Sequence, residues 1–264
     1  MGGLFKLFLW HLLSYGLYAY DLSTPRRPLG PLGVTLDYSL ATTWPTALSN
    51  TGPQVPRNWA WSSHLTFNQP VSQITDAQLW QIAFDAYNEM APDLAQYQIN
   101  PRNTPSAMAV LAWGNQLILA SSQKGPTSFS YNYPSTPVLS SLQLCQTVWR
   151  DDGVMNSDKT HRTDGKCSEQ MAAHLYFFSE TTDLPLQSAR VAAVTKPSRN
   201  ADLRATDPCG DPQRDTWGCN LFVASENLRV LDRTIAPAAY DLTTVAGGVA
   251  VIDQIQLCST IRRY

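Results

Sequence analysis

The sequence predicts an α/β domain in which helices cover a mixed sheet of about five strands, giving a three-layer sandwich. Three observations support this prediction: an amphipathic helix with a capping motif over residues 75–90, two short apolar strands over 108–113 and 116–121, and a later alternation of helices with strands. Alternating elements of this kind are typical of a sheet covered by helical layers. The predicted domain spans residues 73–264.

The first helix has a clear start and a predicted end. Thr75 and Gln78 match a capping box, in which the N-cap residue and the third helical residue satisfy each other's backbone N–H groups. Apolar residues then recur at the spacing of one helical face, namely Leu79, Ile82, Ala83, Ala86 and Met90. Ala91-Pro92 is expected to end the helix, because a proline cannot donate the backbone hydrogen bond of a helix interior.

The two strands that follow are predicted to form a hairpin. Residues 108–113 and 116–121 are apolar runs separated only by Gly114-Asn115, and a two-residue Gly/Asn connection is typical of a tight β-turn. Both runs are nearly continuous in apolar character, which indicates that both faces of the sheet are covered at these strands.

The second half of the chain alternates in type. We expect a helix over about 165–179, a strand over 188–195, a third helix over 217–227 and a strand over 228–231. Residues 142–149 are consistent with a short helix or a strand, and the tail over 240–257 with a helix or a pair of strands.

The N-terminal part of the chain differs from the rest. Residues 1–19 have the pattern of a secretory signal peptide, with Lys6 before a mostly apolar run over 7–17 and Ala19 at the expected cleavage position. A secreted or secretory-pathway protein is therefore predicted, with an uncleaved membrane anchor as the alternative, although the apolar run is short for a membrane span. Residues 20–72 are rich in Pro, Gly, Ser and Thr and are predicted to form an irregular N-terminal arm with one or two short strands, or alternatively a pro-region.

Composition limits the function classes. The chain has 264 residues and 44% hydrophobic content, which suits one large domain with an ample core. Its formal net charge is −2 and it has no run of Lys and Arg, so binding along the phosphates of duplex nucleic acid is not expected. No stable membrane span is expected once the signal peptide is removed.

Chemically informative residues are concentrated around the predicted second and third helices. Cys167-Ser168-Glu169 lies at the start of the second helix, Pro208-Cys209 precedes the third helix, and Cys219 lies in its first turn. Three cysteine thiolates hold a zinc ion with its fourth tetrahedral position free for water, and a carboxylate that is not a ligand can then move protons.

This arrangement resembles the zinc-dependent cytidine and nucleobase deaminase superfamily over about residues 73–235. In that family a Cys-x-Glu motif opens one helix and a Pro-Cys-x-x-Cys motif opens the next. The resemblance implies that Cys167, Cys209 and Cys219 hold Zn²⁺ and that Glu169 carries protons. It also implies hydrolysis at the exocyclic amine of a nucleobase, a nucleoside or a related small molecule. The lack of overall basic charge favours such a small substrate over a polynucleotide.

The sequence departs from this family at the second pair of cysteines. The family places two residues between them, whereas nine residues separate Cys209 from Cys219. Cys219 can reach the metal only if this loop folds back, and a Cys209–Cys219 disulfide explains the same residues without a metal. The chain has five cysteines, so a three-cysteine metal site and a Cys145–Cys258 disulfide would together use all of them, whereas two disulfides would leave one thiol unpaired.

The second functional hypothesis is therefore a non-catalytic secreted protein on the same scaffold, stabilised by disulfides and acting as an effector, a toxin-like protein or an accessory factor for small-molecule production. Two histidines near the motif are not expected to be ligands. His161 lies in a polar loop and is expected to be solvated, and His174 lies on an apolar helix and is expected to be a hydrogen-bonded core residue.

Overall fold

The computed structural model describes residues 20–47, 55–151, 161–211 and 216–258. Its strands are β1 (Thr35–Leu36), β2 (Trp61–Phe67), β3 (Ala107–Trp113), β4 (Gln116–Ser121), β5 (Arg190–Thr195), β6 (Arg204–Thr206), β7 (Arg229–Val230) and β8 (Val249–Asp253). Its α-helices are α2 (Tyr38–Thr43), α3 (Asp76–Gln96), α4 (Phe129–Asn132), α5 (Pro137–Asp151), α6 (Ser168–Ser179) and α7 (Cys219–Ser225).

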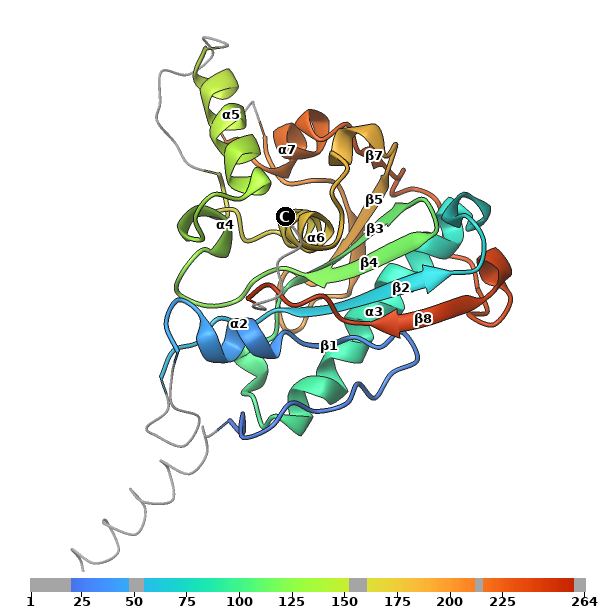
Figure 1. Cartoon of the computed structure of the whole chain (residues 1–264), viewed down its shortest axis with the longest axis horizontal. Helices are drawn as coiled ribbons and strands as arrows, with labels where there is room; N and C mark the ends of the chain where they lie inside the picture. Colours follow the sequence, from blue (N-terminus) through green and yellow to red (C-terminus); the bar gives the residue numbers. More distant parts are fainter. Residues whose placement is uncertain (1–19, 48–54, 152–160, 212–215, 259–264) are drawn as a thin grey trace, which may run out of the picture.

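All the strands join one sheet of eight, in the order β1-β2-β4-β3-β5-β6, with β8 paired to β2 and β7 paired to β5 (Figure 1). The β5–β7 pair is parallel, whereas the neighbouring β3–β5 and β5–β6 pairs are antiparallel. The prediction of a mixed sheet is confirmed, but the predicted size of about five strands is wrong. The additional strands come from segments whose composition gave only a weak strand pattern, chiefly β1, β2, β6 and β8.

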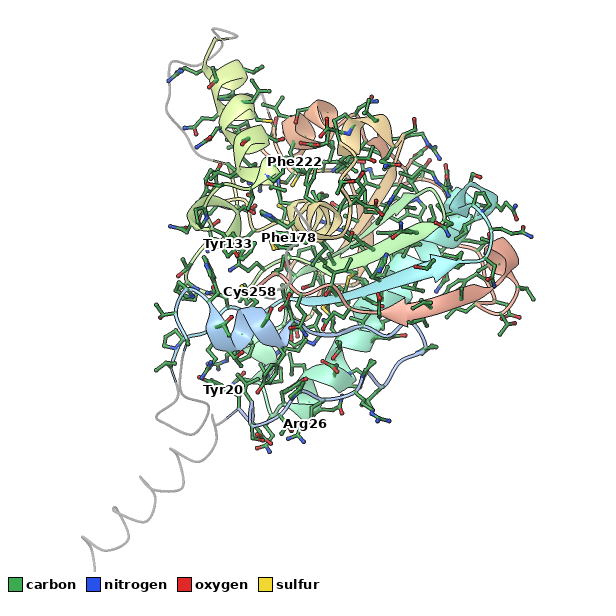
Figure 2. The ribbon with its side chains drawn as sticks, viewed as in Figure 1. Tyr20, Arg26, Tyr133, Phe178, Phe222 and Cys258 are labelled. Atoms are coloured by element: carbon green, nitrogen blue, oxygen red, sulfur yellow. The ribbon has the colours of Figure 1, made fainter. Side chains whose placement is uncertain are left out.

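Helices cover both faces of the sheet, and each face has its own hydrophobic core. Successive residues of a strand point to opposite faces, and β3 and β4 follow this rule. Facing α3 are Met108, Val110, Ala112, Leu117 and Leu119. Facing α6 are Leu111, Trp113, Ile118 and Ala120. The α6 side also contains Tyr133, Phe178 and Phe222, which come from the layer of helices above the sheet (Figure 2). The continuous apolar pattern of the hairpin is explained by this double coverage.

Helix α3 begins as predicted and ends later than predicted. Thr75 is the N-cap, and the capping box with Gln78 is complete. The helix continues through Pro92 to Gln96. Pro92 is exposed, whereas the following Asp93 is buried and accepts hydrogen bonds from the Leu36 backbone N–H (2.9 Å) and the Trp61 indole N–H (2.8 Å). These tertiary contacts stabilise the last turn and offset the hydrogen bond that proline cannot make.

The later elements match the predicted order. The hairpin β3–β4 turns at Gly114-Asn115, with Gly114 at φ +48°. Helix α6, strand β5, helix α7 and strand β7 follow in sequence. Residues 142–149, for which helix and strand were both open, lie within the longer helix α5, and the tail contributes β8.

The segment 20–72 supplies β1, α2 and β2 to the sheet and its cover, and β1 and β2 correspond to the one or two short strands expected there. Strand β2 is internal, since it pairs with β4 on one side and β8 on the other. Its sequence places Ser62, Ser63 and His64 among apolar residues, so it lacks the apolar run that marks β3. Buried Glu89 on α3 accepts hydrogen bonds from the Leu32 and Val34 backbone N–H groups and so attaches the N-terminal segment to the domain.

The predicted signal peptide, residues 1–19, lies outside the described residues. Among the helices that the structure does describe, none combines the length and the apolar composition needed to cross a bilayer.

Candidate metal centre

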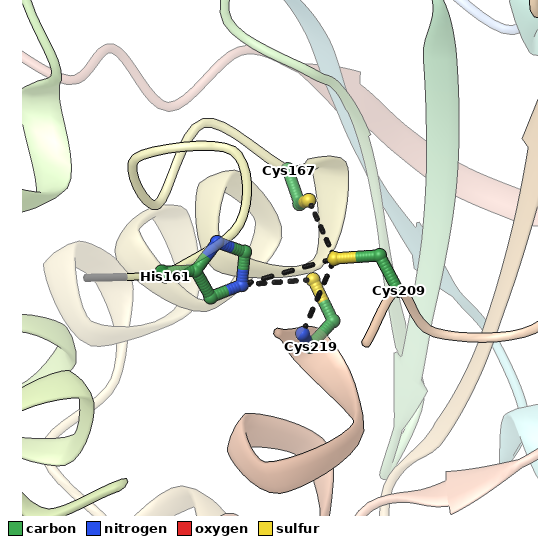
Figure 3. A group of neighbouring side chains, drawn as sticks. All are labelled: His161, Cys167, Cys209 and Cys219. Carbon is green, nitrogen blue, oxygen red and sulfur yellow. Dashed lines mark hydrogen bonds between the residues drawn. The ribbon is translucent and has the colours of Figure 1, made fainter. Parts of the chain in front are cut away.

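Four side chains with metal-ligand chemistry meet where α6 and α7 begin (Figure 3). Cys167 is the N-cap of α6 and Cys219 is the first residue of α7. Cys209 follows β6, and His161 lies in the loop that precedes α6. One ligand atom from each residue lies within 4.8 Å of the corresponding atoms of the other three. The structure therefore brings together the three cysteines selected from the sequence and adds a histidine to them.

The spacing of the ligand atoms fits a tetrahedral ion. The Cys167 and Cys209 sulfurs are 3.4 Å apart. The Nε2 atom of His161 lies 3.6 Å from the Cys219 sulfur and 3.9 Å from the Cys209 sulfur. Zinc–sulfur bonds of about 2.3 Å in a tetrahedron place two sulfurs about 3.8 Å apart. The cluster thus has nearly the dimensions of a zinc site, and among the described residues it is the one convergent group of this kind.

The two ends of the segment between Cys209 and Cys219 are paired with each other, which brings the two cysteines together despite their long spacing in the sequence. Asp211 and Thr216 exchange two backbone hydrogen bonds of 2.7 and 3.1 Å, which closes the loop. The Asn220 N–H then donates to the Cys209 carbonyl at 2.9 Å. Cys219 consequently lies beside Cys209, with its backbone N–H 3.3 Å from the Cys209 sulfur.

Gly218 is needed for this close approach. A Cβ atom at residue 218 would lie 2.5 Å from the Cys209 carbonyl oxygen and 2.6 Å from the Cys209 sulfur, both far inside contact distance. The backbone of Gly218, at φ −165°, is extended, so the requirement is space rather than conformation. The donor set, its convergence and this glycine together fit a bound zinc ion.

None of the five cysteines forms a disulfide, and each is a free thiol in the described part of the chain. The Cys209 and Cys219 pair lies in the cluster without a bond. The Cys145 sulfur instead approaches the Ser225 hydroxyl at 3.6 Å, and the Cys258 backbone N–H donates to Ser39. The two disulfides considered from the sequence are therefore absent from the structure.

His161 was predicted to be solvated, and the structure shows that this is wrong. Its side chain is buried, with its backbone N–H donating to the Tyr131 hydroxyl at 3.1 Å and its ring packed edge-on against Trp217. The turn at Asp164-Gly165, both at positive φ, reverses the chain and brings His161 beside Cys167. The polar neighbours of His161 in the sequence indicated a solvated loop. The Asp-Gly turn between His161 and Cys167 was the available signal that the loop folds back.

The hydrogen bonds of His161 indicate which ring nitrogen carries the proton. Its Nδ1 atom accepts from the backbone N–H groups of Thr163 at 3.2 Å and Gly165 at 3.3 Å. A nitrogen that accepts two backbone donors has no proton of its own, so these contacts assign the proton of the neutral ring to Nε2. The Gln170 side-chain nitrogen lies 3.1 Å from Nε2, so this assignment also requires the Gln170 amide to be turned until its oxygen faces the ring. Nε2 faces the Cys209 and Cys219 sulfurs and is therefore placed to donate to them.

The sulfurs share negative charge. Hydrogen bonds from Cys167, Cys219 and His161 lower the pKa of Cys209 far below the ordinary range of a thiol. The Cys219 backbone N–H also donates to the Cys209 sulfur at 3.3 Å. The pKa of Cys167 is raised, mainly by its hydrogen bond to Cys209, and burial raises the pKa of Cys219. One thiolate is thus stabilised by the protein alone, and a metal cation would supply the charge needed to ionise the other thiols.

Glu169 lies beside the cluster and faces a pocket. Its side chain is buried and accepts a hydrogen bond from the Ser168 hydroxyl at 3.1 Å. Burial and then the negative charge of Cys209 raise its pKa. Glu169, Cys167 and Cys209 all line a pocket of about 840 Å³, whereas Cys219 and His161 do not. The cluster therefore presents two sulfurs and one carboxyl group to a cavity large enough for a small molecule.

His174 is a core residue, as predicted. It is buried, its Nε2 atom lies 3.0 Å from the Ser130 hydroxyl oxygen, and its ring packs edge-on against Phe129. Burial lowers its pKa to about 3, so the ring is neutral at physiological pH.

The candidate metal centre therefore rests on its geometry alone. Comparison of the chain with protein-family models, with curated proteins and with solved structures gave no match in any of the three.

Proposed function

We propose that this chain is a secreted, zinc-dependent deaminase-like hydrolase that acts on the exocyclic amine of a nucleobase, a nucleoside or a related compound. One observation carries the proposal: a convergent three-cysteine cluster borders a pocket, and a buried glutamate lines the same pocket wall. A purely structural metal site has no need of a pocket or of a buried carboxyl group beside it.

Three sulfurs, those of Cys167, Cys209 and Cys219, are proposed as the zinc ligands. The proton on His161 Nε2 occupies the lone pair that a metal would need, so His161 serves as a hydrogen-bond donor to the thiolates. Such a donor reduces the charge density on the sulfurs and orients them. Zinc bound to the three sulfurs would keep one free coordination position and would supply a water of lowered pKa as the nucleophile.

Glu169 is proposed to carry the proton. As a carboxylate it would take a proton from the attacking water while the water oxygen bonds to the ring carbon that bears the amine. It would then deliver that proton to the amine nitrogen, and the carbon–nitrogen bond would break to release ammonia. Its raised pKa suits this exchange, because a proton carrier works best when its pKa lies nearer the working pH. The remaining hydroxyl proton would move to the adjacent ring nitrogen, so the products are ammonia and the corresponding carbonyl compound.

A closed metal site is the competing proposal, and His161 is the observation that favours it. Its Nε2 atom lies 3.6 Å from the Cys219 sulfur. If the ring changed to the tautomer with its proton on Nδ1, Nε2 could bind the metal and complete a Cys₃His set. Such sets are typical of structural zinc, which holds no exchangeable water. The chain would then be a non-catalytic secreted protein whose loops are held by zinc in place of disulfides.

The test is ammonia release by the zinc-loaded protein and by two matched variants. Glu169→Gln should abolish ammonia release from a panel of nucleosides and nucleotides while one zinc per chain remains bound. Glu226→Gln is the control, because Glu226 is also buried and has its pKa raised by burial, but it contacts Ser141 and lies outside the pocket. Activity that survives in Glu169→Gln, or a wild type that binds zinc and releases no ammonia, would refute the catalytic proposal.

A further inference from the structure

A second pocket, of about 600 Å³, adjoins the one that Glu169 faces. The two share Ser106 and Lys124 in their walls. The second pocket is bordered by Tyr87 and Asn88 on α3, by the segment 101–106 before β3 and by the segment 196–199 after β5. It therefore lies at the end of the sheet strands, as a continuation of the pocket beside the metal centre.

This pair of pockets concentrates positive charge. Arg102, Lys124, Lys196 and Arg199 line the second pocket, and none of its lining residues is acidic. The first pocket adds Arg162, Lys166 and Arg204. The two pockets together thus hold seven of the chain's 19 Lys and Arg, against two of its 21 Asp and Glu, namely Glu169 and Asp207.

These cations are available for an external anion. Asp207 is already paired with Arg233 at 2.9 Å, which removes it as a partner. Within the described part of the chain, no carboxylate forms an ion pair with Arg102, Lys124, Lys196 or Arg199. Like charges that are gathered without internal partners repel one another, and an anion bound between them relieves this repulsion.

We propose that the second pocket binds a phosphate group of the substrate whose base enters the first pocket. Arg102 and Arg199 offer the paired N–H donors that suit phosphate oxygens, and Lys196 adds a point charge. Asn88, Thr104 and Ser198 provide polar atoms around them. Either pocket alone has the size of a small-ligand site, so the two together exceed what a nucleoside fills.

This inference rests on the proposed function for the identity of the base, and it narrows the substrate to a nucleoside phosphate. The phosphate belongs either to a free 5′-mononucleotide or to the neighbouring link of a single strand. The expectation of a small molecule in preference to a polynucleotide came from the net charge of the whole chain, −2, which averages over this local group of cations.

Calorimetric titration of the full-length, zinc-loaded Glu169→Gln protein tests the inference without turnover. The ligands are cytidine, adenosine, their 5′-monophosphates and a mixed-sequence single-stranded DNA decamer. We expect the phosphate-bearing ligands to bind about tenfold more tightly than the nucleosides at low salt, since charge-assisted contacts are the strong ones. A Lys196→Gln/Arg199→Gln variant should lose this advantage. Arg27→Gln, an exposed cation that lines neither pocket, should keep it.

The arms of the experiment separate the possible outcomes. Tighter binding of the monophosphate alone identifies a free nucleotide, whereas tighter binding of the decamer identifies a single strand. In the second case the double variant should reduce the slope of log K against log salt by about 1.4, because each phosphate contact contributes about 0.7. Equal binding of nucleosides and phosphates, or an equal loss in Arg27→Gln, would overturn the inference. Phosphate-dependent binding by a wild type that releases no ammonia would instead refute the proposed function and leave the phosphate site intact.

Discussion

Gly218→Ala tests whether the Cys209–Cys219 loop exists to build the metal centre. The added methyl group would lie 2.5 Å from the Cys209 carbonyl oxygen and 2.6 Å from its sulfur, so Cys209 must move. The extended backbone of Gly218 accepts alanine, so steric displacement is the whole effect. Overpacking of this kind costs about 1–3 kcal/mol. Because every 1.4 kcal/mol is tenfold, zinc affinity should fall roughly 5- to 150-fold.

Zinc affinity is measured by competition with a chromogenic chelator, and stability by thermal unfolding with and without zinc. Gly114→Ala is the matched control. Gly114 is at φ +48° in the hairpin turn with nothing within 4 Å of an added Cβ. Gly114→Ala should lower the free energy of unfolding by about 1–2 kcal/mol through backbone strain and leave zinc affinity unchanged. Wild-type zinc affinity in Gly218→Ala would refute the reasoning, as would an equal loss in Gly114→Ala.

Two further predictions concern pH and oxidation. The pKa of His174 is about 3 in the folded protein and 6.5 in the unfolded chain. Between pH 6.5 and pH 3 the unfolded chain therefore binds a proton at His174 that the folded protein does not bind. Stability should therefore drop by about 1.4 kcal/mol for each pH unit below 6.5. Chemical denaturation at several pH values should show that the free energy of unfolding depends less steeply on pH in His174→Phe than in the wild type. An unchanged slope would contradict the assignment of this pH dependence to His174. Zinc removal should leave the Cys167 and Cys209 sulfurs, 3.4 Å apart, open to oxidation. Peptide mapping after mild oxidation should find a Cys167–Cys209 disulfide in chelated protein and little in zinc-loaded protein, whereas equal oxidation of the two would argue against metal protection.

The elements with strong local signals were predicted from the sequence, and those fixed by tertiary contacts were not. The capping box of Thr75 and the Gly114-Asn115 turn depend on neighbouring residues alone, so both are confirmed. The last turn of α3 depends on hydrogen bonds from Leu36 and Trp61 to Asp93, which come from residues far away in sequence. Strand β2 likewise gains its place from its pairing with β4 and β8 rather than from its own pattern.

The candidate site shows the same division. Cys167 and Glu169 were selected from the sequence because they match a motif at a helix start, and Cys209 because it follows a proline in the second motif. Cys219 was left between two interpretations, since only the backbone pairing of Asp211 with Thr216 decides where it lies. His161 was missed because its burial depends on Tyr131 and Trp217, and sequence composition around it is polar.

The central claim is that three sulfurs hold zinc and leave one position free for water, while His161 donates a hydrogen bond from outside the coordination sphere. X-ray absorption at the zinc edge of the zinc-loaded protein tests this directly. We expect three sulfurs at about 2.3 Å and one oxygen, without the outer-shell signature of an imidazole ring. The spectrum of His161→Asn should be the same. A spectrum with three sulfurs and one imidazole nitrogen that changes in His161→Asn, or the absence of bound zinc, would contradict it.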